Sequence, residues 1–184
     1  MNGRPEKNEY NPFYETYVSL VPESEILPAL ESQIQETRAL LGGISEEKSL
    51  YRYGADKWSI RQVIGHLIDG ERVFAFRAFT FSRADTVQLS SFDENHYVSE
   101  ADSDQISLTD LCAEFVALRT ANLLMFKQLT TEAWTRAGTA SNNHITVLAL
   151  AYIMVGHVRH HSKILQERYL SNEKEHHASS QRNI

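Results

Sequence analysis

Four long segments of the chain carry apolar residues at helical spacing, and this pattern restricts the fold more than any other feature. In residues 24–41, Ile26, Leu30 and Ile34 follow one another at steps of four, which places them on one face of a helix. Segments 59–83, 107–129 and 146–170 show similar spacing, without β-type alternation of any length. The sequence therefore predicts an all-α protein built as a bundle of four long helices.

Capping signals support the starts of three of these helices. Ser59 followed by Gln62 is a capping box, in which the serine side chain bonds the amide three residues on and the glutamine side chain reaches back. Ser107 and Thr146 are suitable N-caps for the third and fourth helices. The predicted helices thus begin at defined residues.

A short additional helix is expected near the N-terminus. Asn11 followed by Pro12 is typical of a helix start. Tyr14 and Tyr17 lie three residues apart and share an aromatic face. We expect this face to act as a packing lid, with a direct role of either tyrosine at a pocket as the alternative.

The connection between the second and third long helices is unusually long. Residues 84–105 are rich in Asp, Ser and Asn, so we predict a long ordered loop over one end of the domain. Loops of this length are uncommon in compact domains unless they have a function. A short helix at 131–136 and a loop at 138–144 are expected before the last long helix.

Length and charge set the protein class. The 184 residues suit a single domain, predicted at 1–170, followed by a flexible polar tail at 171–184. A net charge of −6 and 18 scattered Lys and Arg residues argue against nucleic-acid binding. The longest apolar run, 147–155, is far shorter than the roughly 20 residues of a membrane span, so we expect a cytoplasmic protein. The lone cysteine, Cys112, rules out an internal disulfide and is expected to be a small buried residue.

Three of the eight histidines fall in the apolar segment 156–165. His157 and His161 lie one helical turn apart, an arrangement that lets two imidazoles reach one metal ion. His160 points away by about a quarter turn, which favours a supporting contact. The pair needs at least one further ligand to complete a site.

His66, in the second long helix, is the candidate third ligand. Its helical neighbours are apolar, and Gly70, one turn on, leaves room for the ring. Three inward imidazoles without a metal would each need another buried partner, so we assign the metal site to His66, His157 and His161. Asp69 is a candidate to hold the second ring nitrogen of a ligand histidine, with a surface ion pair as its alternative.

The remaining polar candidates have weaker signals. Arg77, Arg119 and Arg159 are able to bind a substrate carboxylate, although surface or interhelical ion pairs are the default interpretation. His96 and His144 are expected in solvated loops, with His96 the better placed to line a pocket mouth.

Trp58-Ser59-Ile60, the run from Gly65 to Arg72, and Gly156-His157 with His160-His161 together resemble the DinB-like superfamily of DinB/YfiT-like metalloenzymes. The resemblance covers residues 10–169. It implies an antiparallel four-helix bundle with up-down-down-up order, one metal-binding histidine from the second helix and an HxxxH pair from the last. It also implies a divalent metal, usually zinc or nickel, and frequent homodimers.

Three functions remain open at this point. Characterised relatives of this kind are thiol-dependent, which favours a metal-dependent S-transferase that joins a low-molecular-weight thiol to a small electrophile. Metal-dependent hydrolysis of an amide or ester is the alternative, and a non-catalytic metal-binding module of a stress response is the third. In each case the expected partner is a small molecule or the ion itself.

Overall fold

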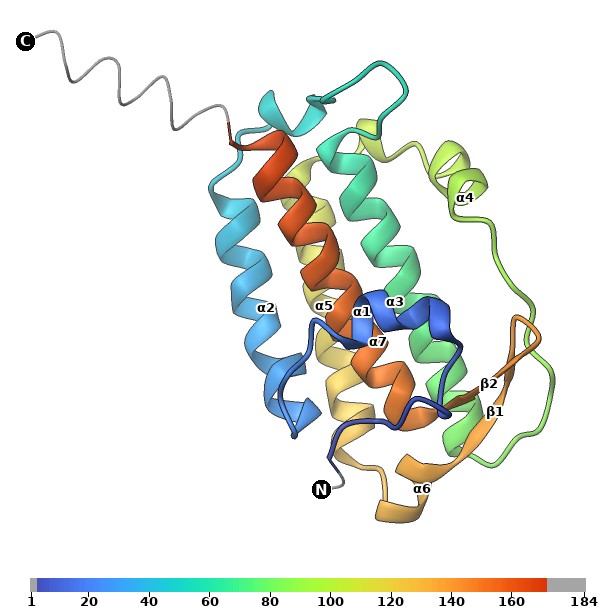
Figure 1. The fold of residues 1–184 in the computed structure, drawn as a ribbon. Helices are drawn as coiled ribbons and strands as arrows, with labels where there is room; N and C mark the ends of the chain where they lie inside the picture. Colours follow the sequence, from blue (N-terminus) through green and yellow to red (C-terminus); the bar gives the residue numbers. More distant parts are fainter. Residues whose placement is uncertain (1–2, 172–184) are drawn as a thin grey trace, which may run out of the picture.

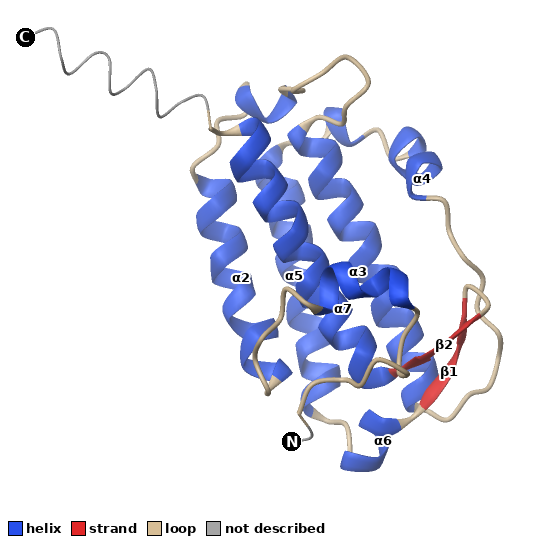
Figure 2. Ribbon diagram, viewed as in Figure 1, coloured by secondary structure: helices blue, strands red, loops and turns tan. Residues whose placement is uncertain are grey.

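The computed structural model describes residues 3–171, and four long helices form its body (Figures 1 and 2). These helices are α2 (Ile26–Gly42), α3 (Ile60–Ser82), α5 (Leu108–Lys127) and α7 (Val147–Ile164). The prediction of an all-α four-helix bundle is confirmed. Apart from Ser171, the tail predicted at 171–184 lies outside the described residues.

The order of the helices is up-down-down-up. Helix α3 packs against both α5 and α7, and α2 packs against the same two helices from the other side. In Figure 1, α2 and α7 run in one direction while α3 and α5 run in the other. Because α3 and α5 are parallel neighbours, the chain must travel the full length of the bundle between them.

Helix starts follow the sequence signals. The Ser59 side chain accepts a hydrogen bond from the Gln62 amide, and the Gln62 side chain accepts one from the Ser59 amide, so the capping box is complete. Ser107 and Thr146 also cap their helices through the amide three residues on. These caps fix the upper end of α3 and the lower end of α7 in Figure 1.

The connection from α3 to α5 contains more helix than the sequence suggested. It holds α4 (Glu94–Glu100) and the 3-10 turn η3 (Ser103–Gln105), so the prediction of a loop throughout 84–105 is wrong. Asp93 starts α4, since its carboxylate accepts bonds from the amides of Asn95 and His96. The connection rises beside α3 in Figure 1 and covers one side of the bundle.

A small β-hairpin replaces the loop predicted at 138–144. Strands β1 (Ala137–Ala140) and β2 (Asn143–Thr146) pair antiparallel. Ser141 and Asn142 form the turn with φ values of 53° and 61°, as expected for a two-residue hairpin turn. Leu89 of the connection bridges to Ala140, which ties the connection to the hairpin.

The other short elements are η1 (Pro12–Tyr14), α1 (Glu15–Val18), η2 (Lys48–Leu50), α6 (Thr131–Thr135) and η4 (Leu165–Tyr169), the last a π-helical turn. Most of the short elements lie near the ends of the bundle, whereas η1 and α1 cross its middle (Figure 1). Helices η1 and α1 form the short N-terminal helix that Asn11 and Pro12 predicted. Helix α1 crosses α7 at Gly156, where an added Cβ would lie 2.1 Å from the Tyr17 carbonyl oxygen.

The core consists of two apolar clusters with polar side chains between them. One cluster contains the C-terminal part of α3 with Phe74 and Phe81, and the other contains its N-terminal part with Ile60 and Leu67. The buried polar residues His66, Glu71, Arg119 and His157 lie at the level where the clusters meet. None of the described helices is long and apolar enough to cross a membrane.

Candidate metal centre

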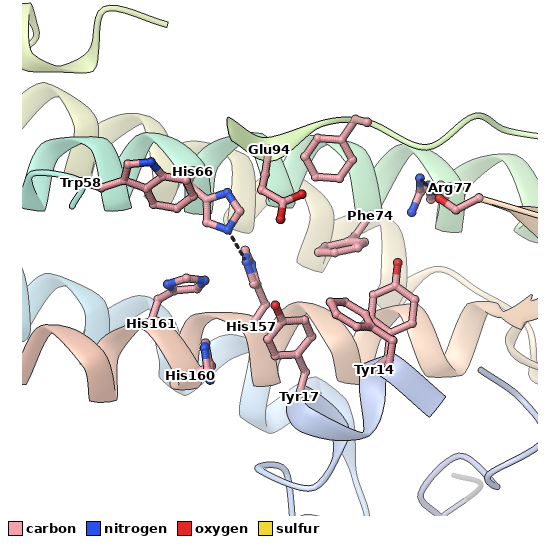
Figure 3. A pocket seen from close by; sticks show the side chains of 13 residues that line it. Tyr14, Tyr17, Trp58, His66, Phe74, Arg77, Glu94, His157, His160 and His161 are labelled. Atoms are coloured by element: carbon pink, nitrogen blue, oxygen red, sulfur yellow. Dashed lines mark hydrogen bonds between the residues drawn. The ribbon is translucent and has the colours of Figure 1, made fainter. Parts of the chain in front are cut away.

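The three histidines singled out by the sequence lie together on facing helices. His66 comes from α3, and His157 and His161 come from successive turns of α7. One nitrogen of each ring lies within 4.8 Å of the others. Their ring centroids are 4.8 Å apart in all three pairs. The rings therefore form a triangle that faces one point (Figure 3).

The closest pair of nitrogens has the spacing of two metal ligands. His66 Nε2 and His157 Nε2 are 2.9 Å apart, and two nitrogens that each lie about 2.0–2.1 Å from one ion are about 3 Å apart. Only one proton can occupy the space between them. The contact thus leaves at least one nitrogen lone pair directed into the triangle.

Burial keeps all three rings in the form that binds metal. Burial lowers the pKa of His66 to about 4 and, together with His66 and His160, that of His161 to about 3. The pKa of His157 is lowered well below its usual range by burial and by His161 and His66. Neutral imidazoles retain the lone pairs that a divalent ion requires.

One polar atom of the cluster lacks a partner within the described residues. His66 is 7% exposed, and its Nδ1 atom is buried without a hydrogen-bond partner among the described residues. Such atoms are rare in protein interiors and call for a physical reason. Three converging, neutral nitrogen donors match the ligand preference of zinc and nickel, so these residues fit a divalent ion.

Neighbouring residues hold the rings in place. An added Cβ at Gly70 would lie 2.8 Å from the His157 ring, so glycine makes room for that imidazole. The Trp58 ring packs 5.0 Å from His66, and the Tyr17 ring packs 5.2 Å from His157. The close crossing of α1 over Gly156 places Tyr17 in this position. Glycines on both faces of the site thus permit its packing.

A cavity of about 290 Å³ opens on the histidine triangle. Aromatic side chains form most of its wall (Figure 3). The lining residues come from the N-terminal segment, the turn before α3, α3 itself, the connection, the hairpin and α7: Phe13, Tyr14, Tyr17, Trp58, His66, Phe74, Arg77, Phe92, Glu94, Ser141, His157, His160 and His161. Tyr14 and Tyr17, expected mainly as a packing lid, therefore also face the pocket.

Glu94 is a site residue that the sequence reading missed. It is the first residue of α4, and its side chain points toward His66 and His157 in Figure 3. Its charge acts against the lowering of the His66 pKa and raises that of Tyr17. The one available signal was the unusual length of the polar connection, since nothing in the local sequence separates Glu94 from other surface acids.

Asp69 does not join the cluster. Its carboxylate lies 4.0 Å from Arg72 and is half-buried, and no hydrogen bond joins it to a histidine among residues 3–171. Three residues along a helix from His66, it lies on the side of α3 that faces Glu114 of α5. Asp69 thus fits its alternative interpretation, a surface ion pair, better than contact with a ligand histidine.

The other candidates lie in different surroundings. His160 lines the cavity, and its ring lies 5.5 Å from that of Tyr17. Arg119 and Arg159 form ion pairs with Glu71 and Glu23, and Cys112 is half-buried at a separate pocket. His96 and His144 are exposed, but they lie in α4 and β2 and not in loops. Of the three arginines, only Arg77 reaches the cavity.

Comparisons with known proteins match both the sequence and the architecture of this chain. The family model of the DinB superfamily matches residues 29–165. YfiT from Bacillus subtilis, described as a probable metal-dependent hydrolase with an unusual four-helix bundle topology, superimposes with a TM-score of 0.71 at 17% identity, over 90% of this chain and 91% of that chain.

A second solved structure is similar at lower coverage. The mycothiol-dependent maleylpyruvate isomerase superimposes with a TM-score of 0.62 at 9% identity, over 74% of this chain. The match spans 57% of the isomerase, a little over half of its length. The search of curated proteins finds no match. These two structures establish the fold.

Proposed function

Because the chain belongs to the DinB superfamily, we propose that it is a metal-dependent enzyme whose ion is held by His66, His157 and His161. The observation that carries this proposal is the convergence of three neutral imidazoles on the wall of an aromatic cavity. A divalent ion with three neutral ligands, zinc or nickel in our proposal, lowers the pKa of a thiol or a water at its open position.

The activity we propose first is thiol-dependent S-transfer to a small electrophile. The cavity of about 290 Å³ has room for an organic molecule, since one water occupies about 30 Å³. Its largely aromatic wall suits an organic electrophile with an apolar body. The similarity to a mycothiol-dependent isomerase agrees with a low-molecular-weight thiol as the second cofactor.

Two residues of the wall have roles in this reaction. Glu94 Oε accepts the proton of the bound thiol, and because Glu94 is exposed at the cavity mouth, it passes that proton to solvent. Burial and the Glu94 charge raise the pKa of Tyr17, so its hydroxyl stays protonated and donates a hydrogen bond to negative charge that develops on the substrate.

Metal-dependent hydrolysis of an amide or ester is the second candidate. The position of Glu94 favours it, since the same carboxylate can take a proton from a water. The similarity to YfiT, described as a probable metal-dependent hydrolase, supports the same alternative. A non-catalytic metal-binding module of a stress response is the third candidate.

A comparison of two assays tests these candidates. Protein loaded with Zn²⁺ or Ni²⁺ is mixed with glutathione or bacillithiol and a chloronitrobenzene, and thioether formation is followed by absorbance. The second assay follows p-nitrophenyl acetate hydrolysis without thiol. We expect thioether formation that His157→Ala abolishes and Glu94→Gln slows by about 100-fold or more. His144→Ala removes an exposed histidine outside the cavity and should have no effect.

Each other outcome selects a different candidate. Thiol-independent ester hydrolysis that requires His157 would support the hydrolase. Metal binding without turnover in either assay would support the non-catalytic module. Full metal occupancy in His66→Ala would contradict the ligand assignment itself. A single domain at 1–170, a homodimer and a cytoplasmic location stay predictions.

A further inference from the structure

Arg77 occupies the end of the cavity opposite the histidines. It follows His66 by eleven residues on α3, which is about three helical turns, so the two side chains leave the same face about 16 Å apart along the axis. Figure 3 shows Arg77 beyond the rings of Phe74 and Tyr14 as seen from His66. The cavity therefore has a histidine end and an arginine end.

The Arg77 guanidinium is buried without an acidic partner among residues 3–171. The residue is 2% exposed, and its hydrogen bonds to residues in 3–171 both come from Nη2, to the Ser90 carbonyl oxygen at 2.8 Å and to Ser141 Oγ at 3.0 Å. Neither acceptor carries a charge. A buried cation is costly unless an anion compensates it, and Arg77 has Nε and Nη1 left to donate.

The surroundings of Arg77 fix its position. Ser90 belongs to the connection and Ser141 to the hairpin turn, so two separate segments hold Nη2 in place. A guanidinium that is already fixed loses less conformational entropy than a mobile one when it binds a carboxylate through two parallel hydrogen bonds. At the other end, the Glu94 carboxylate repels anions, which favours an acidic group at Arg77.

We propose that Arg77 is an anion-binding residue that selects small molecules with a carboxylate at one end, an apolar middle and their reactive group at the histidine cluster. The nature of that reactive group rests on the proposed function, whereas the carboxylate subsite does not. The carboxylate belongs either to the thiol cofactor or to the electrophile. Both sources place the same chemistry at Arg77.

Binding to metal-free protein tests the subsite alone. Chelator-treated protein is titrated with hexanoate, hexan-1-ol and hexylammonium, and binding is followed by calorimetry and by the fluorescence of Trp58, which lines the cavity. We expect hexanoate to bind about 10- to 100-fold more tightly than hexan-1-ol, and hexylammonium to bind most weakly. Equal binding of the three probes to the wild-type protein would overturn the proposal.

Substitutions separate charge from folding. Arg77→Gln should abolish the preference for hexanoate, and Arg77→Lys should keep part of it. Arg83→Gln is the matched control, since it removes an exposed arginine just after the same helix. Circular dichroism checks that each variant is folded. If a folded Arg77→Gln variant kept the full preference, the proposal would be wrong; if it did not fold, the wild-type probe series decides.

Metal-loaded protein identifies the source of the carboxylate and tests the proposed function separately. A 6-mercaptohexanoate that binds more tightly than both hexanoate and 6-mercaptohexanol places the carboxylate on the thiol. Turnover with a neutral thiol that needs an acidic electrophile, such as 4-chloro-3-nitrobenzoate, places it on the electrophile. If a thiol group adds nothing to binding or turnover while the Arg77-dependent preference persists, the transferase proposal fails and the subsite stands.

Discussion

Two buried polar clusters share the centre of this bundle, and they differ in how completely their hydrogen bonds are made. In one, Arg119 donates from Nε and Nη2 to the two carboxylate oxygens of Glu71, each at 2.8 Å, and from Nη1 to Gln33 at 2.6 Å. Asn122 donates to Glu71 at 2.9 Å. The charges compensate each other, and the network joins α2, α3 and α5.

The histidine cluster is incomplete by the same measure. His66 Nδ1 lacks a partner within the described residues, and two Nε2 atoms face each other at 2.9 Å. The first cluster is closed and holds the helices in register, whereas the second opens on a cavity. Buried groups that satisfy one another serve the fold, and those left unsatisfied beside a cavity mark the place for a ligand.

The largest effect is expected from breaking the closed cluster. Arg119→Met leaves the Glu71 carboxylate buried without a cation, and we expect the free energy of unfolding to fall by about 3–5 kcal/mol. Urea denaturation of the metal-free protein measures this loss. Replacing both partners, as Arg119→Met with Glu71→Leu, should recover most of it. If Arg119→Met alone were as stable as the wild type, the Arg119–Glu71 cluster would not stabilise the fold as we describe.

Completing the open cluster should have the opposite sign and a smaller size. Zn²⁺ at 100 times its dissociation constant should raise the free energy of unfolding by about 2.7 kcal/mol, because only the folded state assembles the site. The increment is measured as the difference between denaturation curves with and without the ion. His157→Ala should remove it and Arg119→Met should keep it. The same increment in both variants would place the ion elsewhere.

The smallest effect is expected on the stability of the metal-free protein when the pH is lowered. The folded pKa of His66 is about 4, below its usual 6.5, so its contribution to stability is complete above pH 6.5 and is lost as pH falls toward 4. Between pH 6.5 and 5.5, each histidine with a pKa lowered in this way should reduce the free energy of unfolding by about 1 kcal/mol. Denaturation at both pH values measures the loss, and His66→Gln should reduce it by that amount. An unchanged loss would show that His66 is not buried as described.

Sequence reasoning recovered the parts of the molecule that depend on helical periodicity. A helix repeats its apolar face every three or four residues, so α3 and α7 and the positions of His66, His157 and His161 on them were predictable. The capping box at Ser59 fixed the start of α3 to the residue. These signals are local, so they can be recognised in a single sequence.

The parts that were missed depend on contacts between distant segments. The hairpin has strands of four residues each, too short for alternation to be visible, and Ser141-Asn142 is a weak turn signal beside Asn-Gly. Glu94 lines the same cavity as the histidines because the connection folds back along α3, which its local sequence does not encode. Asp69 was the reverse case, close in sequence to His66 but directed toward α5.

The parallel arrangement of α3 and α5 obliges residues 83–107 to run the length of the bundle, and this segment brings Glu94 and Phe92 to the cavity and Ser90 to the Arg77 side chain. The connection and the helices α3 and α7 therefore form different walls of the same cavity. A substitution in the connection can therefore change the shape of the cavity while the helices that carry the three histidines stay intact. The fold thus separates the helices that carry the histidines from a covering segment that completes the cavity.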